Sequence, residues 1–330
     1  MTEDNKKGSL IISLDFEMMW GGIDIWTPDD YGKSHVEQVR EVIKRLVSLF
    51  NEYQVHATFA TVGLLMHHDK EEAVKNIPLS VPTYKDRKKS PYEHDFLSLI
   101  KESDEYLFFA HDIITFLKRQ TNIEIGTHTY SHYYCWEQGQ TVEQFNDDLL
   151  KAFEIATKNN IKLESIVFPR NEVSPNYLNV CRKYGIKTFR GNALKYFDEP
   201  KNKWDGIKYR LLRLIDAYIN IGGKTTFPYN QIDLSESPIN IRASRFLRPY
   251  SQKLSMFEWL RLRRIRKEME YAAKHHEIYH LWWHPHNFGN YLDKNISFLE
   301  KVLNYYQYYN NKYGMQSFTM NELFDNLKRL

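Results

Sequence analysis

The stretch Ser9-Leu10-Ile11-Ile12-Ser13-Leu14-Asp15-Phe16-Glu17 decides the fold class, because a short apolar run ends abruptly in acidic residues. The run is short and partly β-branched, which predicts a buried strand. Alternate residues of an extended segment share a face, so Asp15 and Glu17 can point into one pocket. Two carboxylates in one pocket can divide the roles of metal ligand and general base. Taken alone, two acids at a strand end more often form a solvated turn.

The chain that follows alternates between predicted helices and predicted strands. Residues 35–53 carry apolar side chains at helical spacing, and residues 55–62 read as a second strand. A strand–helix–strand unit at this spacing indicates a parallel sheet. Further strands are predicted at 123–126, 165–168, 186–189 and 278–283, and further helices at 112–119, 142–159, 175–184, 257–275 and 295–313.

This rhythm is interrupted at about residues 67–110 and 194–275, which we interpret as helical and loop insertions. The chain contains no internal repeat, low-complexity tract or convincing linker. Repeated strand–helix units in a chain of 330 residues favour one α/β domain over residues 1–330, built as a (β/α) barrel.

Composition narrows the class of partner and the compartment. The net charge of +3 gives no global field that would attract nucleic acid. The two cysteines require no disulfide framework, which favours a reducing compartment. The polar N-terminus lacks the apolar segment of a signal peptide, and no apolar run is long enough for a transmembrane helix. We therefore expect a cytoplasmic protein.

Two histidines follow the predicted strand at 123–126. His128 and His132 stand at i and i+4, which places them on one side of a helical turn and suits the chelation of one divalent metal ion. Thr129 stands where the metalloprotease helix motif requires glutamate, so the pair does not belong to that motif. Taken alone, the pair leaves a metal site and ordinary packing both open.

Two further polar residues also follow predicted strands. Arg170 comes after the strand at 165–168, and an arginine there can keep a carboxylate ionised, although a surface arginine would look the same. His284 ends the strand at 278–283, and Pro285 stiffens the chain beyond it. An imidazole in that place can donate a proton to a leaving amine, whereas the alternative is a core histidine under Trp282 and Trp283.

Together and in this order, the motifs resemble those of the polysaccharide deacetylase superfamily, the NodB-homology carbohydrate esterases of the family 4 type. The matching segments are S-L-D-F-E at 13–17, H-T-Y-S-H at 128–132, R-N-E-V-S-P at 170–175 and L-W-W-H at 281–284. The strand with Ala57-Thr58-Phe59 is similar to another conserved strand of that family. The resemblance runs from about Leu10 to Pro285 and implies a distorted (β/α) barrel of the NodB type with insertions.

This sequence departs from the family pattern in two places. The acids of the first motif are separated by Phe16 and the second is a glutamate, which resembles a variant found in branches with amide substrates outside the chitin-like group. The family's fourth motif, an aspartate near a tryptophan, has no clear counterpart. Asp205 beside Trp204 lies in a poor setting for that role, so the partner of His284 stays open.

The resemblance implies a role for each site residue. Glu17, His128 and His132 would hold one divalent metal ion, with Zn²⁺ expected from a carboxylate–His–His set. Asp15 would be the general base, Arg170 would orient it, and His284 would protonate the leaving amine. A backbone N–H near Tyr133 would stabilise the oxyanion. The residues expected to bind substrate, with core packing as the alternative for the aromatic ones, are Tyr133, Trp136 and His286.

The implied activity is metal-dependent hydrolysis that removes an N-acyl group, with N-acetyl expected, from a sugar of a cell-surface polysaccharide or its cytoplasmic precursor. Two alternatives stay open: another C–N amide hydrolase of the superfamily, allantoinase-like or deformylating, and an inactive glycan-binding protein on the same barrel. The basic amphipathic helix at 257–275 suits peripheral contact with the inner membrane face or a pyrophosphate-linked sugar donor, with a solvated helix face as the simpler interpretation.

Overall fold

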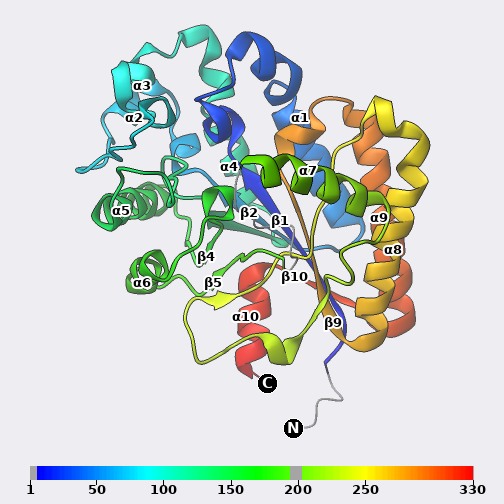
Figure 1. Cartoon of the computed structure of the whole chain (residues 1–330). Helices are drawn as coiled ribbons and strands as arrows, with labels where there is room; N and C mark the ends of the chain where they lie inside the picture. Colours follow the sequence, from blue (N-terminus) through cyan, green and yellow to red (C-terminus); the bar gives the residue numbers. More distant parts are fainter. Residues whose placement is uncertain (1–5, 194–202, 330) are drawn as a thin grey trace.

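Parallel strands run through the middle of the molecule in the computed structural model, which describes residues 6–193 and 203–329 without the side chains of 203–205 and 207 (Figure 1). The strand order in the sheet is β6-β9-β1-β2-β3-β4-β5-β7, in which β6 is Phe227–Pro228, β7 is Ile239–Asn240 and β9 is Glu277–Trp283. Among the described strands, only β6 pairs in the antiparallel sense. The first five strands along the chain are β1 (Ser9–Phe16), β2 (Ala57–Thr61), β3 (Ile123–Thr127), β4 (Ser165–Ile166) and β5 (Thr188–Phe189).

Strand β1 lies at the centre, and all eight of its residues are buried. It is flanked by β2 and by β9 (Glu277–Trp283), both parallel to it, while β10 (Gln316–Phe318) pairs with its first residues. Buried strands of a parallel sheet are apolar on both faces, as residues 9–14 predicted. The odd-numbered side chains from Ile11 to Glu17 share one face, because side chains alternate along a strand.

One segment closes the curled sheet by changing its partner strand. Strand β7 (Ile239–Asn240) pairs with β5, and strand β8 (Arg245–Phe246) pairs with β9. Between them, the backbone N–H of Ala243 still donates to Gly191, whereas that of Ser244 donates to His280. The chain therefore crosses from one edge of the sheet to the other within a few residues. The predicted distorted (β/α) barrel is confirmed.

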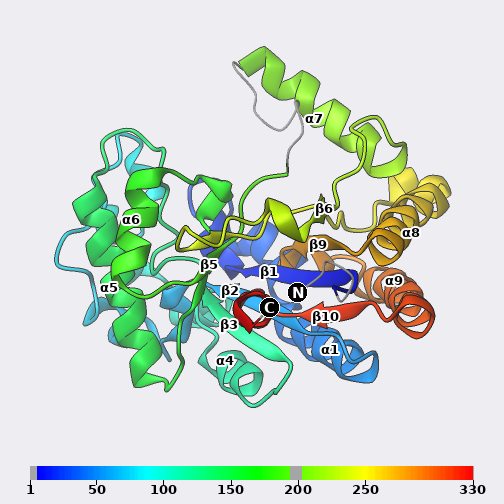
Figure 2. The same ribbon diagram turned by 90° about the horizontal axis from the view of Figure 1, so that it is seen from below.

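Helices surround the sheet on its outer side (Figures 1 and 2). The predicted helices are present, with their ends shifted by a few residues. They are α1 (Val39–Glu52), α4 (His111–Lys118), α5 (Val142–Lys158), α6 (Pro175–Lys183), α8 (Glu258–His275) and α9 (Leu292–Tyr313). The turn before α1 is a separate π-helical element, η3 (Pro28–Val36), so the helix expected from residue 35 begins only at Val39.

The C-terminal helix α10 (Met320–Arg329), which the apolar periodicity did not predict, lies at the end of the barrel near the two termini (Figure 1). Its buried residues Met320, Leu323 and Leu327 belong to an apolar cluster that also contains Ile11 and Ile278 of the barrel strands. Helix α10 therefore covers this end of the barrel, where the apolar cluster lies beside the Glu124 carboxylate, which accepts hydrogen bonds from Thr58 and Ser165. Ser13 and Asp15 of β1 lie toward the opposite end.

The insertion expected at 67–110 consists of short helical elements. They are α2 (Lys70–Val74), α3 (Phe96–Leu99), and the 3₁₀ turns η5 (Arg87–Lys89), η6 (Glu93–Asp95) and η7 (Glu102–Leu107), which follow η4 (Gly63–Met66). None of its described residues joins the sheet. Figure 1 shows this region above the end of the barrel where the strand β1 finishes.

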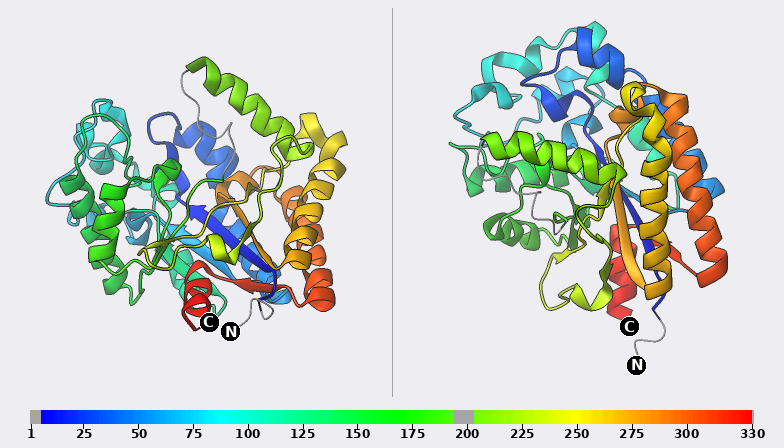
Figure 3. Two further views of the ribbon diagram at one scale, coloured as in Figure 1. Left: turned by 60° about the horizontal axis from the view of Figure 1, so that its bottom comes forward. Right: turned by 45° about the vertical axis from the view of Figure 1, so that its right-hand side comes forward.

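The region 194–275 differs from the expected insertion. It contributes β6 (Phe227–Pro228), β7 and β8 to the sheet, and α8 packs against β9, so most of its described part belongs to the barrel. It also contains α7 (Lys203–Tyr218), which no pattern predicted. Figures 2 and 3 show α7 standing away from the barrel and meeting it near α8. Its side chains Leu211 and Ile215, and Ile219 just after it, are exposed, so they form no core-facing stripe.

A buried group of two acids and two arginines attaches α7 to the barrel. Glu268 of α8 lies 2.8 Å from Arg245 and 2.7 Å from Arg264. Asp216 of α7 lies 3.5 Å from Arg245 and 3.7 Å from Arg264. The basic face predicted for residues 257–275 is therefore only partly on the surface, because Arg264 and also Arg261 point inward.

We predict that Glu268→Leu lowers the free energy of unfolding by about 3–5 kcal/mol, because it leaves buried guanidinium groups without full compensation. Urea denaturation measures this change. The control is Glu270→Leu on the same helix, which removes only a surface pair with Lys274 and should cost less than about 1 kcal/mol. Equal effects of the two substitutions would contradict the prediction.

Candidate metal centre and active site

The strand register brings the predicted site residues to one end of the barrel. Asp15 is opposite Ala60, Thr61 is opposite Thr127, and Thr127 is opposite Ile166. The carboxyl ends of four neighbouring strands are therefore level. Polar residues at or just beyond the ends of parallel strands meet there, as is typical of α/β folds. The pocket of about 360 Å³ at this end is lined by, among others, Asp15, Glu17, His128, His132, Arg170, His284 and His286.

The Glu17 carboxylate and two imidazoles form a compact, buried set of donor atoms. Glu17 Oε2 lies 3.3 Å from His128 Nε2 and 2.9 Å from His132 Nε2. Bonds of about 2.0–2.2 Å from a tetrahedral zinc ion would separate its ligand atoms by about 3.3 Å. The three predicted metal ligands therefore lie close together at a spacing that fits one zinc-sized ion.

The charge states of these groups also suit metal binding. His128 Nδ1 donates to the carbonyl of Val167 at 2.7 Å, which leaves a lone pair on Nε2 toward the pocket. Burial lowers the pKa of His132, so this ring is neutral at pH 7. Burial alone would raise the pKa of Glu17. The nearby histidines, His284 and His132 among them, together lower it by more, so the net pKa lies well below its usual range. A carboxylate and imidazoles that present Nε2 to one point are the donor types that divalent metal ions bind.

The histidine loop differs from the helical turn expected from its spacing. Thr129 and His132 have φ angles of 65° and 59°, and residues 128–134 form no helix. The buried carboxylate of Asp148, on α5, accepts hydrogen bonds from the backbone N–H groups of Tyr130 and Ser131 and from the Ser131 hydroxyl. This carboxylate holds the loop in a conformation that a local pattern does not encode. Burial raises the pKa of Asp148 to about 6.

The structure assigns the partner of Asp15 to Arg190 rather than to Arg170. The Arg190 guanidinium donates to both carboxylate oxygens of Asp15, at 2.6 and 2.8 Å, and both side chains are buried. Burial alone would raise the pKa of Asp15. The opposing effect of neighbouring positive groups, Arg190 first among them, is larger, so the net pKa lies below its usual range. Asp15 is therefore ionised and fixed in orientation.

Arg190 is itself held from several sides. It also donates to Ser13 Oγ and to Asn171 Oδ1, and its guanidinium lies 4.2 Å from the centre of the Trp282 ring. Sequence reasoning missed this residue, although Arg190 directly follows β5 just as Asp15 and Glu17 sit at the end of β1. Its position after a strand was the available signal.

Arg170 occupies the rim of the pocket instead. Its side chain is 43% exposed, its guanidinium lies 4.1 Å from the centre of the Tyr134 ring, and Nη2 lies 3.8 Å from Asp24. Arg170 lines the pocket, but within the described part of the chain it forms no hydrogen bond or ion pair with Asp15. The R-N-E-V-S-P motif therefore supplies a rim arginine and Asn171, which binds Arg190.

His284 lies on the other side of the two acids. Its Nε2 is 3.7 Å from Asp15 Oδ2 and 3.6 Å from Glu17 Oε1. The amide of Asn287 lies 3.1 Å from Nδ1, so Nε2 is the ring nitrogen turned toward the two acids. His286 is buried and its Nε2 is 3.9 Å from Glu17 Oε1, so it belongs to the same cluster. Burial lowers the pKa of His286 to about 3.

The predicted substrate-binding aromatics have different positions. Tyr133 is fully buried, its hydroxyl donates to Gln140 and Thr141, and its backbone N–H donates to Thr129, so it packs beneath the loop and offers no free donor. Trp136 is 59% exposed and lines a cleft next to the pocket. The side chains of Trp204 and Asp205 lie outside the described residues.

Residues 25–189, half of the chain, match the family model for polysaccharide deacetylase. The chain belongs to the polysaccharide deacetylase family. The matched span contains both histidines of the H-T-Y-S-H motif but ends one residue before Arg190. The acids of β1 and His284 also lie outside it, and the barrel brings them to the histidines. The comparison with curated protein sequences found no match to this chain.

Solved structures share the architecture of this family member at low sequence identity. A Mycobacterium smegmatis protein described as a polysaccharide deacetylase is 12% identical, with a TM-score of 0.59 over 98% of this chain and 92% of that chain. A GH57-type branching enzyme from Pyrococcus horikoshii is also 12% identical, with a TM-score of 0.55 over 96% of this chain and 70% of that chain. These likenesses establish the fold alone. None of the described helices is both long and apolar enough to cross a bilayer.

We predict that Arg190→Leu lowers the free energy of unfolding by about 3–5 kcal/mol, because it leaves Asp15 buried and unpaired. The double substitution Asp15→Leu with Arg190→Leu removes both charges and should cost much less than the sum of the single ones. A double-mutant cycle by urea denaturation measures the coupling. Additive effects would contradict a direct buried pair.

We predict that Asp148→Ala weakens zinc binding at least about tenfold, because the histidine loop loses the carboxylate that holds it. Competition with a chromogenic chelator measures the affinity. The matched control is Asp147→Ala, its neighbour on α5, which does not bond to the loop. Unchanged zinc affinity in Asp148→Ala would show that the loop keeps its conformation without the hydrogen bonds to Asp148.

Proposed function

We propose that this protein is a zinc-dependent deacetylase that removes an N-acetyl group from a sugar of a cell-surface polysaccharide or of its cytoplasmic precursor. The observation that carries the proposal is the convergence of Glu17, His128 and His132 on one point, with Asp15 and His284 close to it. Membership of the polysaccharide deacetylase family supports the substrate class.

Glu17, His128 and His132 would hold the metal ion through one oxygen and two Nε2 atoms. Three protein ligands leave a coordination position open, as catalytic zinc sites do. Bound there, zinc supplies a Lewis acid that polarises the acyl carbonyl and lowers the pKa of a coordinated water.

The remaining residues hold and move protons. Asp15 is kept ionised by Arg190, so its carboxylate accepts the proton of the attacking water. His284 Nε2 faces the two acids; as an imidazolium, His284 would donate the Nε2 proton to the departing amine and be left as the neutral ring. Arg190 acts as a positioning residue, because its side-chain hydrogen bonds within the described residues are to Asp15, Ser13 and Asn171.

A cytoplasmic precursor would meet this site before its export, and peripheral contact with the inner membrane face would then run through the outward-facing residues of α8. The structure leaves Arg263 and Lys267 exposed on this helix, whereas Arg261 and Arg264 are buried. Release of formate or of a ureide product in place of acetate would indicate one of the other C–N hydrolases of the superfamily.

We expect about one zinc ion per chain in the purified protein and none in His128→Ala, because two remaining ligands hold zinc weakly. Elemental analysis measures this ratio. His275→Ala, an exposed histidine at the end of α8, is the control and should keep its zinc. A wild-type protein that takes up no divalent ion would overturn the hydrolase mechanism in favour of a glycan-binding protein.

We expect Asp15→Asn to keep zinc but to lose at least about 10² of the rate of acetate release, because the amide cannot accept a proton. Acetate release from N-acetylated sugars, measured beside zinc content, separates the two effects. Loss of zinc in Asp15→Asn with retention in Glu17→Gln would mean that the two acids have exchanged roles.

A further inference from the structure

A second and larger cavity adjoins the metal pocket. It has a volume of about 980 Å³, against about 360 Å³ for the metal pocket, and the two share Arg170, Asn171, Trp282 and His284 in their walls. Helix α7 forms the far wall with Arg210 and Arg213. A ligand too large for the metal pocket has room to extend into this second cavity, which we call the arginine cleft.

The described lining of the arginine cleft is strongly basic. It contains five arginines, Arg170, Arg210, Arg213, Arg245 and Arg248, and one carboxylate, Glu172. Arg245 is neutralised by the buried acids Glu268 and Asp216. Glu172 is half-buried and accepts a hydrogen bond from the backbone N–H of Trp136, and burial raises its pKa.

Arg248 carries a charge in the cleft that lacks a neighbouring carboxylate in the described part of the chain. Its side chain is half-buried, and no carboxylate of the described residues forms an ion pair with it. Burial lowers its pKa, and the positive charges of Arg213 and Arg261 lower it further against the opposite effect of Tyr218. Arg261 forms an ion pair with Glu258 and donates to the backbone carbonyl of Arg248. Neither contact compensates the charge of the Arg248 guanidinium.

A partly desolvated guanidinium beside other cations is unfavourable unless an anion compensates it. Arg210, exposed on α7, adds a further charge that has no ion-pair partner in the described part of the chain. Guanidinium groups bind phosphate oxygens through paired hydrogen bonds. A phosphate ester carries about 1.5 to 2 negative charges at pH 7, so it balances several arginines better than one carboxylate does.

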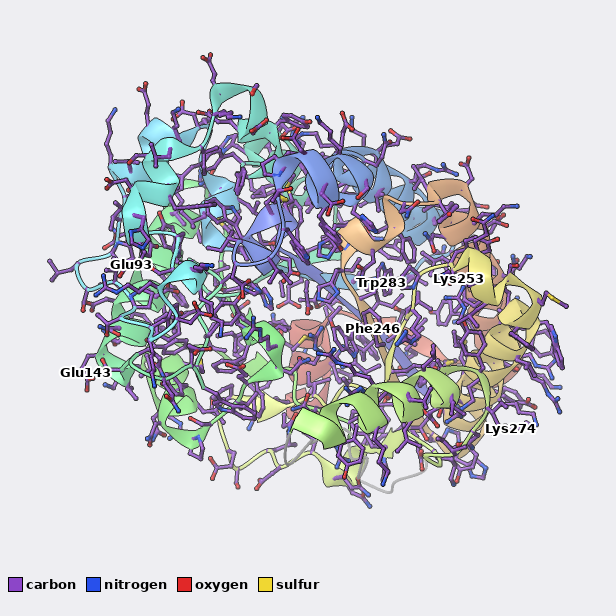
Figure 4. All side chains as sticks on the ribbon, turned by 45° about the horizontal axis from the view of Figure 1, so that its top comes forward. Glu93, Glu143, Phe246, Lys253, Lys274 and Trp283 are labelled. Carbon is purple, nitrogen blue, oxygen red and sulfur yellow. The ribbon has the colours of Figure 1, made fainter. Side chains whose placement is uncertain are left out.

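We propose that the arginine cleft binds a phosphate or diphosphate group through which the N-acyl sugar is attached to its carrier. This rests on the proposed function, because it assumes that the sugar occupies the adjoining metal pocket. Trp282, in the wall that the two cavities share, lies beside Phe246 of the arginine cleft, with ring centres 4.8 Å apart. This apolar surface suits contact with a sugar ring between the two charged ends. Figure 4 places Phe246 near the middle of the molecule, whereas Glu143 and Lys274 lie at its rim.

The first test is calorimetric titration of the zinc-loaded full chain with inorganic phosphate. We expect Arg248→Met to weaken phosphate binding at least tenfold, and the control Arg119→Met, an exposed arginine next to α4, to leave it unchanged. Because phosphate can also ligate zinc, His128→Ala is titrated in parallel. Binding that survives in His128→Ala and is lost in Arg248→Met supports the cleft, whereas the reverse pattern, or no binding to the wild type, overturns it.

Thermal unfolding and zinc content of Arg248→Met show whether the variant is folded, and Arg248→Lys, which keeps the charge, should recover part of the affinity. Competition against phosphate then distinguishes the carrier: a nucleotide-diphosphate sugar and a short lipid-diphosphate sugar are compared. If neither of these two compounds competes with phosphate, the sugar-phosphate assignment is overturned. Phosphate binding in a chain that takes up no zinc would overturn the proposed function alone, and normal zinc and acetate release without phosphate binding would overturn this inference alone.

Discussion

The buried ion pair between Asp15 and Arg190 is the contact on which the geometry of the site depends. It joins the central strand β1 to the end of β5, across the interior of the barrel. Because a buried charge that loses its partner is destabilising by several kcal/mol, the two side chains have one favourable arrangement. Ser13 and Asn171 add hydrogen bonds to Arg190 and restrict it further. Once Asp15 is fixed, the alternation of β1 directs Glu17, two residues on, toward the histidines.

The interior face of β1 changes character along its length. Ile11 belongs to the apolar cluster that α10 covers, whereas Ser13, Asp15 and Glu17 take part in polar contacts. The apolar cluster at the α10 end stabilises the barrel by removing side chains from water, and the Glu124 carboxylate beside it is held by hydrogen bonds from Thr58 and Ser165. At the polar end, Asp15 pairs with Arg190, and Glu17 lies against His128 and His132. Stability and chemistry are thus placed at opposite ends of the same strands, as in other α/β barrels.

Local patterns were sufficient for the parts of the site that a single strand or turn positions. The apolar run before Asp15 and the two acids on one face predicted the central strand and its pocket, and the spacing of His128 and His132 predicted a shared ligand point. The helical turn expected there was wrong, because Asp148 of α5 holds the loop in another conformation. Helix α7 was not expected, because its apolar residues face solvent and its attachment is by buried charges.

The sequence by itself therefore determined the alternation of strands and helices, the family, and most of the residues that come together at the strand ends, because each depends on periodicity or on short motifs. Only the tertiary structure decided which arginine binds Asp15 and how the barrel closes. Arg170 and Arg190 both follow strands, and the choice between them depends on the distance across the barrel, which no local spacing contains. The closure depends on a segment that leaves β5 and joins β9, strands that are nearly ninety residues apart in the chain.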